Sequence, residues 1–327
     1  MEKLATESLR TDGEVRRPTL KGHIQIARFD HWTKNVFVLP GVVAALFIDR
    51  AQLGRLDFLE MLIGLLAIGL IASSNYIINE VLDAPFDRKH PTKRFRPVPS
   101  GEVNVPLAYV QWIAFMVAGL ALGLMVSKAY AGVLLVLWFM GCLYNIPPFR
   151  TKDIPYLDVL SEAINNPLRM VAGWYLTETA LLPPTTLTIS YWMAGCYFMA
   201  IKRYAEMRDI GDVAVSASYR RSFGFYTQER LLISITFYAA CAMLFFGAFI
   251  MRYRMELILS FPLVAFVMST YFAMAFKPDS GAQRPETLYR EPWLMVAVVS
   301  CAVLMVVLLF VDVPMLYHVF EPTVPVR

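Results

Sequence analysis

Apolar runs of helical length follow one another along almost the whole chain. Each run of roughly 20 residues is long enough to cross the hydrocarbon core of a bilayer. The runs lack the strict alternation of barrel strands, so we expect each backbone to satisfy its hydrogen bonds within a helix. The nine predicted spans are residues 29–48, 58–82, 104–126, 129–147, 155–177, 184–202, 230–250, 256–276 and 292–312.

This pattern predicts an all-α, polytopic integral membrane protein whose nine transmembrane helices form a bundle around a central cavity. With 57% hydrophobic and 17% charged residues, the composition excludes an ordinary soluble domain. Residues 1–22 are polar and are expected to be a mobile cytoplasmic tail, and residues 23–327 a single transmembrane domain. The first apolar run begins too late for a cleaved signal peptide.

Basic residues gather in the loops on one side of the predicted bundle. The N-terminal tail and every second loop carry most of the Lys and Arg residues. By the positive-inside rule these segments are cytoplasmic, and an odd number of spans places the C-terminus outside. We therefore expect a multi-pass protein of the bacterial inner (plasma) membrane, and its positive charge indicates membrane topology rather than nucleic-acid binding. The opposite side keeps only Arg50, Arg55, Lys128, Arg252, Arg254 and Arg327.

The first group of chemically suggestive residues, the first cluster, lies where the second span ends. Asn79, Asp83 and Asp87 follow at steps of four, which places them along one helical face. Pro85 is expected to bend or end the helix before Asp87. Clustered carboxylates need a cation between them, and Mg²⁺ favours oxygen ligands together with substrate phosphates. The basic residues that follow, expected to bind phosphates, are Lys93, Arg94 and Arg96.

The second cluster follows the sixth span and mixes both signs of charge. Ionisable residues at membrane depth are functional candidates, and this cluster lies on the same predicted side as the first. Together the two would form a metal and diphosphate pocket with two acidic walls. The alternatives are that the first cluster is a solvated charge run and that the second is a structural ion-pair network. The second cluster comprises Lys202, Arg203, Tyr204, Glu206, Arg208, Asp209 and Asp212, with Tyr219, Arg220, Arg221 and Tyr226 downstream.

Between the clusters, a proline-stiffened loop carries Tyr144 and Lys152 and leads into a helix with a polar stripe. Such a stripe must face protein or a water-filled cavity. Lys34, just inside the first span, is a further candidate, although its ammonium could simply reach the membrane interface. Isolated histidines and scattered cysteines argue against zinc. The stripe consists of Asp158, Glu162, Asn166 and Arg169.

At these residues the chain resembles the UbiA superfamily of intramembrane prenyltransferases. The run from Asn79 to Asp87 is similar to that superfamily's first Asp-rich motif, with Glu80 in place of the usual Asp, and Arg96-Pro97 to Gly101 matches its continuation. Residues 90–97 and 202–206 look most like decaprenyl-phosphate phosphoribosyltransferases of bacterial cell-wall arabinan synthesis. The resemblance implies a UbiA-like fold and Mg²⁺-dependent transfer of 5-phosphoribose from phosphoribosyl diphosphate to a polyprenyl phosphate.

The two clusters and the resemblance together give an expected site. The expected catalytic residues are Asp83, Asp87, Lys202, Arg203 and Glu206. The expected Mg²⁺ ligands are Asn79, Glu80, Asp83, Asp87, Asp209 and Asp212. The expected substrate-binding residues are Lys34, Asn79, Lys93, Arg94, Arg96, Tyr144, Lys152, Arg169, Tyr204 and Arg220.

Two other functions fit parts of the sequence. A prenyl diphosphate could ionise in the same pocket and alkylate an aromatic acceptor, with aromatic faces stabilising the allyl cation; the proline-rich start of the Tyr144–Arg169 segment looks more like such prenyl-transferring members. A lipid transporter without chemistry would place its charges near the bilayer midplane, whereas most charges here fall at helix ends. The expected partners are a diphosphate substrate, a polyprenyl lipid and membrane lipids, without nucleic acid, in a possible homo-oligomer.

Overall fold

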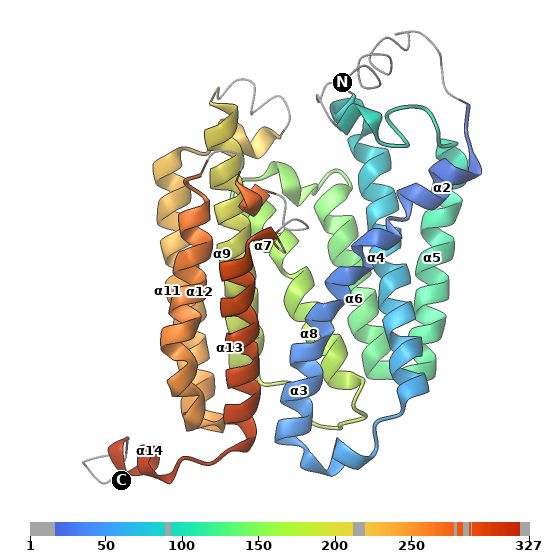
Figure 1. Ribbon diagram of the computed structural model, residues 1–327. Helices are drawn as coiled ribbons and strands as arrows, with labels where there is room; N and C mark the ends of the chain where they lie inside the picture. The colour runs from blue at the N-terminus through green and yellow to red at the C-terminus, as the bar shows by residue number, and fades with distance from the viewer. Residues whose placement is uncertain are drawn as a thin grey trace.

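The computed structural model describes residues 17–88, 93–211, 220–277, 280–283, 288 and 290–320, and this part of the chain is helical without strands. Two groups of roughly parallel helices stand side by side (Figure 1). The first contains α2 (Leu20–Ile26), η1 (Phe29–Val38), α3 (Leu39–Ile48), η2 (Arg50–Gly54), α4 (Phe58–Asp87), η3 (Lys93–Phe95), α5 (Val105–Val126) and α6 (Lys128–Asn145). After η4 (Thr151–Asp153) come α7 (Leu157–Ala163), α8 (Asn165–Tyr175), α9 (Thr185–Ile210), η5 (Arg221–Gly224), α11 (Gln228–Tyr253), η6 (Met255–Ser260), α12 (Phe261–Met274), η7 (Gly281–Gln283), α13 (Pro292–Phe310) and α14 (Pro314–Val319).

The membrane-spanning character of the chain is clear, but the count of nine is not confirmed. Seven helical segments of the described chain are long and apolar enough to cross a membrane. The predicted fifth span is instead two short helices, α7 and α8, which meet at Ile164. The predicted sixth span is α9, whose 26 residues are long enough but contain interspersed Thr, Ser and Tyr residues that make it less apolar.

Local sequence explains where several helices begin. Asn104 accepts a hydrogen bond from the Leu107 amide before α5, and Ser127 accepts one from the Tyr130 amide before α6. These side chains satisfy amide groups that have no partner within the helix. Pro85 does not end α4, which continues to Asp87. Proline removes one amide donor near the helix end, where the remaining hydrogen bonds keep the last turn intact.

The break at Ile164 divides the predicted polar stripe. Pro167 lies in the first turn of α8, where its missing amide is tolerated. Glu162, Asn166 and Arg169 line a cavity between the two helix groups. Asp158 instead is fully buried and contacts η5 and the loop beside it.

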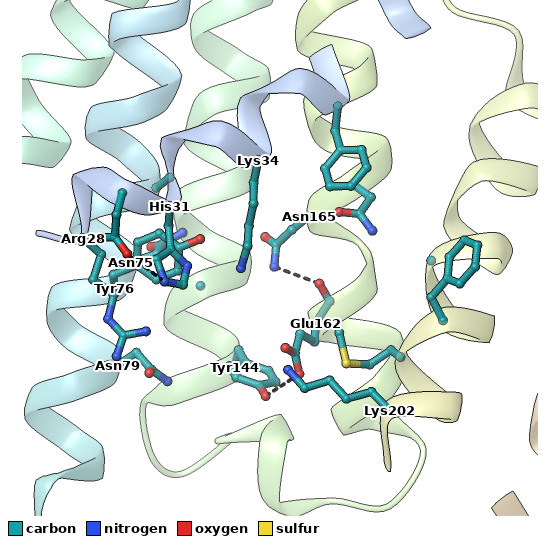
Figure 2. A pocket seen from close by; sticks show the side chains of 18 of the residues that line it. Arg28, His31, Lys34, Asn75, Tyr76, Asn79, Tyr144, Glu162, Asn165 and Lys202 are labelled. Carbon is teal, nitrogen blue, oxygen red and sulfur yellow. Dashed lines mark hydrogen bonds and ion pairs between the residues drawn. The ribbon is translucent and has the colours of Figure 1, made fainter. Parts of the chain in front are cut away.

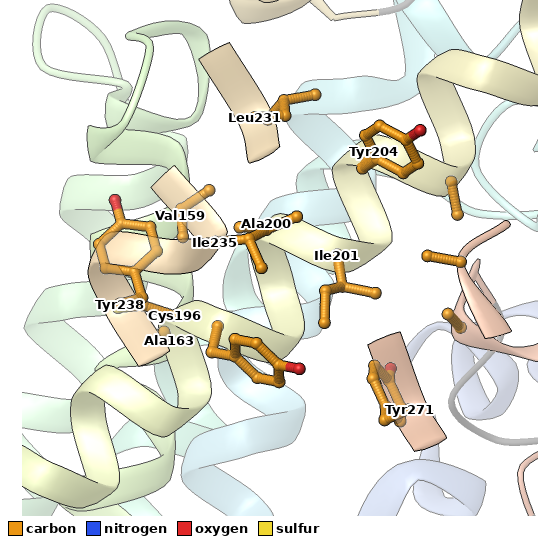
Figure 3. Close-up of a cluster of buried hydrophobic side chains, with 14 of the residues drawn as sticks. Val159, Ala163, Cys196, Ala200, Ile201, Tyr204, Leu231, Ile235, Tyr238 and Tyr271 are labelled. Carbon is orange, nitrogen blue, oxygen red and sulfur yellow. The ribbon is translucent and has the colours of Figure 1, made fainter. Parts of the chain in front are cut away.

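Close helix packing holds both groups together. A Cβ added at Gly41 of α3 would lie 1.7 Å from the Met170 carbonyl oxygen of α8, so only glycine permits this approach. The second group, which contains α9, α11, α12 and α13 (Figure 1), packs around a buried apolar cluster centred on α9 and α11. This cluster includes Cys196, Ile201 and Tyr238 (Figure 3). Dense packing of this kind fixes the positions of the side chains that face the cavity.

The first and last described helices lie at opposite ends of the bundle. Helix α2 is at the same end as the C-terminal ends of α4, α6 and α9, whereas α14 is at the other end (Figure 1). Residues 1–16 of the expected tail lie outside the described chain. The expected boundary after residue 22 falls inside α2, whose N-cap residue Thr19 donates its amide to the Glu102 carbonyl oxygen.

Candidate active site

A cavity of about 1480 Å³ opens between the two helix groups. Its polar side chains come from η1, α4, α6, η4, α7, α8 and α9, and several of them point toward one another in Figure 2. Its apolar side is formed by α9, α12 and α13, through residues such as Phe198, Val267, Leu294 and Val298. A ligand with a charged head and an apolar tail would match this division.

Asp83 and Asp87 line the cavity from the last turns of α4. Asp83 Oδ1 lies 2.5 Å from Lys152 Nζ and 2.8 Å from Arg150 Nη2. Asp87 Oδ2 accepts a 2.7 Å hydrogen bond from Arg96 Nη1. Each carboxylate therefore faces a cation held by a neighbouring loop.

Asn79 and Glu80 occupy different surroundings, although they are neighbours in sequence. Asn79 Nδ2 donates to Asn145 Oδ1 at 2.6 Å and to Asp83 Oδ2 at 3.3 Å. Glu80 is 1% exposed, and its two oxygens accept hydrogen bonds from the Val98 amide and Arg28. Through both of its oxygens, Glu80 holds the loop after α4 in place, and its expected part as a metal ligand stays a prediction.

Arg203 organises the second wall. Its guanidinium is 1% exposed and donates to Glu162 Oε2, while Nε lies 3.2 Å from Asp158 Oδ2 and Nη1 lies 3.7 Å from Glu206 Oε2. Glu162 also accepts a 2.9 Å hydrogen bond from Tyr144 Oη. Helices α6, α7 and α9 are thus joined by charged groups at the cavity surface.

Asp158 connects this wall to the segment after α9. Its carboxylate accepts hydrogen bonds from Tyr226 Oη at 2.5 Å, Ser222 Oγ at 3.3 Å and Arg220 Nη1 at 3.4 Å. Arg220 lines the cavity, and its side chain also donates to Tyr144 Oη. Asp158 is therefore a buried anchor for Arg203 and Arg220 rather than a cavity residue.

The two walls face one cavity, as expected. Asp83, Asp87 and Glu206 all line it. Burial lowers the pKa of Lys93, which belongs to the loop after α4, while Glu206 of α9 and Asp87 of α4 oppose that shift. The Lys93 ammonium group thus interacts electrostatically with carboxylates of both helices.

Burial also lowers the pKa of Lys152 to about 8, against the opposing effect of Asp83. Lys152 Nζ is held by Asp83 Oδ1 and Asn145 Oδ1 at the cavity surface. Its positive charge is present below this pKa and is lost as the pH rises through it. The loop between α6 and α7 therefore supplies a cation whose charge changes near neutral pH.

The structure brings most of the expected site residues to the cavity, and three lie elsewhere. Arg94 is exposed and packs on Phe95. Tyr204 is 5% exposed within the apolar cluster of Figure 3, because its neighbour Arg203 takes the cavity face of α9. Asp209 does not line the cavity, and it accepts hydrogen bonds from Arg208 and Gln283. Asp212 lies outside the described residues. Those that line the cavity are Lys34, Asn79, Glu80, Asp83, Asp87, Lys93, Arg96, Tyr144, Lys152, Arg169, Lys202, Arg203, Glu206 and Arg220.

Several cavity residues were not predicted to belong to the site. Asn75 lies about one helical turn before Asn79 on α4, and Tyr76 lies slightly less than one turn before it. The step of four therefore already pointed toward Asn75. Tyr191 gave no signal, because a single tyrosine in an apolar helix is common. The unpredicted residues that line the cavity include Arg28, His31, Asn75, Tyr76, Asn145, Asn165 and Tyr191.

Oxygen ligands for a divalent cation are present at the mouth of the cavity. No group of three His, Cys, Asp or Glu residues with metal-binding geometry occurs within the described ranges. Mg²⁺ is usually bound through one or two carboxylates together with substrate phosphates and water, rather than by a complete protein cage. The Asp83 and Asp87 carboxylates on successive turns of α4 fit that arrangement.

Comparison with known proteins gives a consistent result. The model of the UbiA prenyltransferase family matches residues 37–296. A decaprenyl-phosphate phosphoribosyltransferase of Mycobacterium tuberculosis is 30% identical over 230 residues, covering 69% of this chain and 72% of the relative. A digeranylgeranylglyceryl phosphate synthase of Saccharolobus solfataricus is 35% identical over 128 residues, covering 38% and 42%. The structure of a UbiA homolog from Archaeoglobus fulgidus bound to GPP and Mg²⁺ matches with a TM-score of 0.66 at 20% identity, covering 88% of this chain and 99% of that one.

Proposed function

The chain belongs to the UbiA prenyltransferase family and is a membrane-embedded transferase, and from this premise we propose that it transfers 5-phosphoribose from phosphoribosyl diphosphate to a polyprenyl phosphate with the help of Mg²⁺. Relatives named decaprenyl-phosphate phosphoribosyltransferase, at 30% identity over more than two thirds of both chains, support the choice of substrates. The Mg²⁺ in a related structure supports the choice of cation.

The observation that carries the proposal is the distribution of charge in the single cavity. Asp83 and Asp87 lie on one wall, and Lys93, Lys152, Lys202 and Arg220 line the same space. Two carboxylates alone would repel a diphosphate, and cations alone would not hold Mg²⁺. Their combination suits a metal-bound diphosphate.

When bound, Mg²⁺ would neutralise charge on the departing diphosphate. Asp83 and Asp87 would hold the cation, and Asn79 Nδ2 donates a hydrogen bond to Asp83 Oδ2 beside it. Lys152 lies against Asp83 in the structure, so the arriving diphosphate would give this ammonium a new partner. Lys93 and Arg220 would orient the remaining phosphate oxygens through charge-assisted hydrogen bonds.

In the proposed reaction the bond between ribose C1 and the diphosphate oxygen breaks, and the diphosphate leaves with the electron pair. An oxygen of the polyprenyl phosphate forms the new bond to C1. Because this nucleophile is already anionic, no side chain has to remove a proton from it. The chain's contribution is to position the two substrates and to stabilise the negative charge that develops on the leaving group.

The apolar side of the cavity supports a lipid acceptor. Val267 of α12 and Leu294 and Val298 of α13 line it, and Val298 is 39% exposed. A polyprenyl tail could pass from this apolar wall into the bilayer, while its phosphate stays in the polar part. We place the cavity mouth on the cytoplasmic side, because the basic loops lie at the α2 end of the bundle.

Turnover by the purified protein tests the proposal. Protein in nanodiscs with Mg²⁺ is incubated with labelled phosphoribosyl diphosphate and polyprenyl phosphate, or with a labelled prenyl diphosphate and 4-hydroxybenzoate. The proposal predicts labelled lipid in the first reaction. Label found only in a prenylated ring would contradict it and would favour prenyl transfer instead.

A further inference from the structure

Arg169 carries a buried positive charge that the diphosphate site at the mouth does not use. The residue is 6% exposed and lines the cavity from α8. Its Nη1 donates to the Asn165 carbonyl oxygen, and its Nε has no hydrogen-bond partner. Among the described residues no carboxylate forms an ion pair with it. A buried guanidinium in this state is prepared for an anion that arrives from outside the chain.

Arg169 lies deeper in the bundle than the diphosphate site. Its guanidinium interacts with the hydroxyl groups of Tyr76 and Tyr191. Tyr76 precedes Asp83 by seven residues within the continuous helix α4, which is about 10 Å at ~1.5 Å per residue. The group around Arg169 therefore lies about two helical turns from Asp83 along α4.

Lys34 adds a second cation near Tyr76. It lines the cavity from η1, and its side chain reaches into the space between Asn75 and Asn165 (Figure 2). Its Nζ lies 6.0 Å from the centre of the Tyr76 ring, and no carboxylate of the described chain forms an ion pair with it. Asn75 Oδ1 is buried without a partner nearby and could accept a hydrogen bond from a hydroxyl group.

We propose that Arg169 and Lys34, with the hydroxyls of Tyr76 and Tyr191, form a deep site for a phosphate monoester, separate from the diphosphate site at the mouth. The inference rests on the proposed function and specifies its substrate class. Phosphoribosyl diphosphate carries a 5-phosphate across the ribose ring from its diphosphate, and the ring carries hydroxyls. A prenyl diphosphate has neither group, so the buried Arg169 guanidinium and the Lys34 ammonium would face only its hydrocarbon chain.

The phosphate could come from the donor or from the acceptor lipid, and binding measurements distinguish the two. Full-length protein in nanodiscs is titrated with ribose 5-phosphate, with polyprenyl phosphate, and with pyrophosphate plus Mg²⁺. Arg169→Gln is expected to weaken binding of one phosphate monoester by about ten- to a hundredfold, since it removes a charge-assisted contact. Pyrophosphate affinity should stay within twofold, which also shows that the variant is folded.

Weaker binding of ribose 5-phosphate identifies the donor's 5-phosphate as the occupant, and weaker binding of polyprenyl phosphate alone identifies the acceptor. Lys34→Met should weaken binding of the same ligand, and Arg169→Lys should recover part of it. Arg252→Gln, an exposed arginine on α11 that does not line the cavity, is the matched control.

The inference is overturned if Arg169→Gln leaves both monoesters unchanged, or if it weakens pyrophosphate equally. The proposed function fails separately, if the wild-type protein binds these phosphates but transfers no phosphoribose.

Discussion

The buried carboxylate of Asp158 offers a direct test of how the second wall is held together. Asp158 is fully buried and accepts hydrogen bonds from Arg203, Arg220, Ser222 and Tyr226. Asp158→Asn keeps the size of the side chain but removes its charge. Arg203 would lose one of its carboxylate partners while remaining 1% exposed.

Loss of one partner from a buried ion pair costs roughly 3–5 kcal/mol. That is a large part of a typical net stability of ~5–15 kcal/mol. At roughly 2–3 °C per kcal/mol for a chain of this size, the melting temperature should fall by roughly 6–15 °C. Arg220 would lose its anchor at the cavity, so the KM for the diphosphate substrate should rise as well.

Thermal unfolding in detergent, followed by intrinsic fluorescence, measures the effect. The matched control is Asp153→Asn, because Asp153 pairs with Arg150 through a side chain that is 21% exposed, so its loss should cost less than the loss of the fully buried Asp158. A melting temperature of Asp158→Asn equal to that of the control would refute the reasoning that Asp158 is a structural anchor.

Three further outcomes are expected. Pyrophosphate affinity in Mg²⁺ should fall as the pH rises through about 8, because burial lowers the pKa of Lys152 to that value and its charge is lost above it. Calorimetric titration of Lys152→Arg should show an affinity that depends less on pH. A pH dependence equal to that of the wild-type protein would assign the effect to another group. Gly41→Ala should prevent stable assembly, since the new Cβ would lie 1.7 Å from the Met170 carbonyl oxygen, whereas Gly247→Ala meets nothing within 4 Å and should be tolerated in size-exclusion chromatography; equal behaviour of the two would contradict the α3–α8 packing. Tyr204→Phe should keep the wild-type KM, because Tyr204 lies in the apolar cluster. A tenfold rise in KM would show instead that Tyr204 takes part in substrate binding.

Hydropathy predicted the helices well because each apolar run ends at a polar loop. The expected second span, 58–82, corresponds to α4, and only its last turn was placed differently, since Pro85 was expected to interrupt it. The break at Ile164 was missed, although Pro167 was visible in the sequence. An apolar run does not show whether neighbouring helices compensate for an interrupted backbone.

The step of four from Asn79 to Asp87 predicted a shared face, and these residues do line one cavity. Tyr204 was expected in the site as a member of the second cluster, but it lies in the apolar cluster, because adjacent residues on a helix point in different directions. Glu80 lies beside the motif, yet its oxygens bind Arg28 and the Val98 amide. Such partners depend on the path of the loop after α4, which periodicity does not determine. The catalytic and metal-binding roles of the cavity residues stay predictions.

Calorimetric binding of pyrophosphate, with and without Mg²⁺, tests most directly whether Asp83 and Asp87 hold a metal-bound diphosphate at the cavity mouth. The wild-type protein should bind pyrophosphate in Mg²⁺ and lose most of that affinity in a chelator. Asp83→Asn combined with Asp87→Asn should remove the dependence on Mg²⁺ while the protein remains folded. Equally tight, Mg²⁺-dependent binding by the double variant would contradict the assignment of these carboxylates.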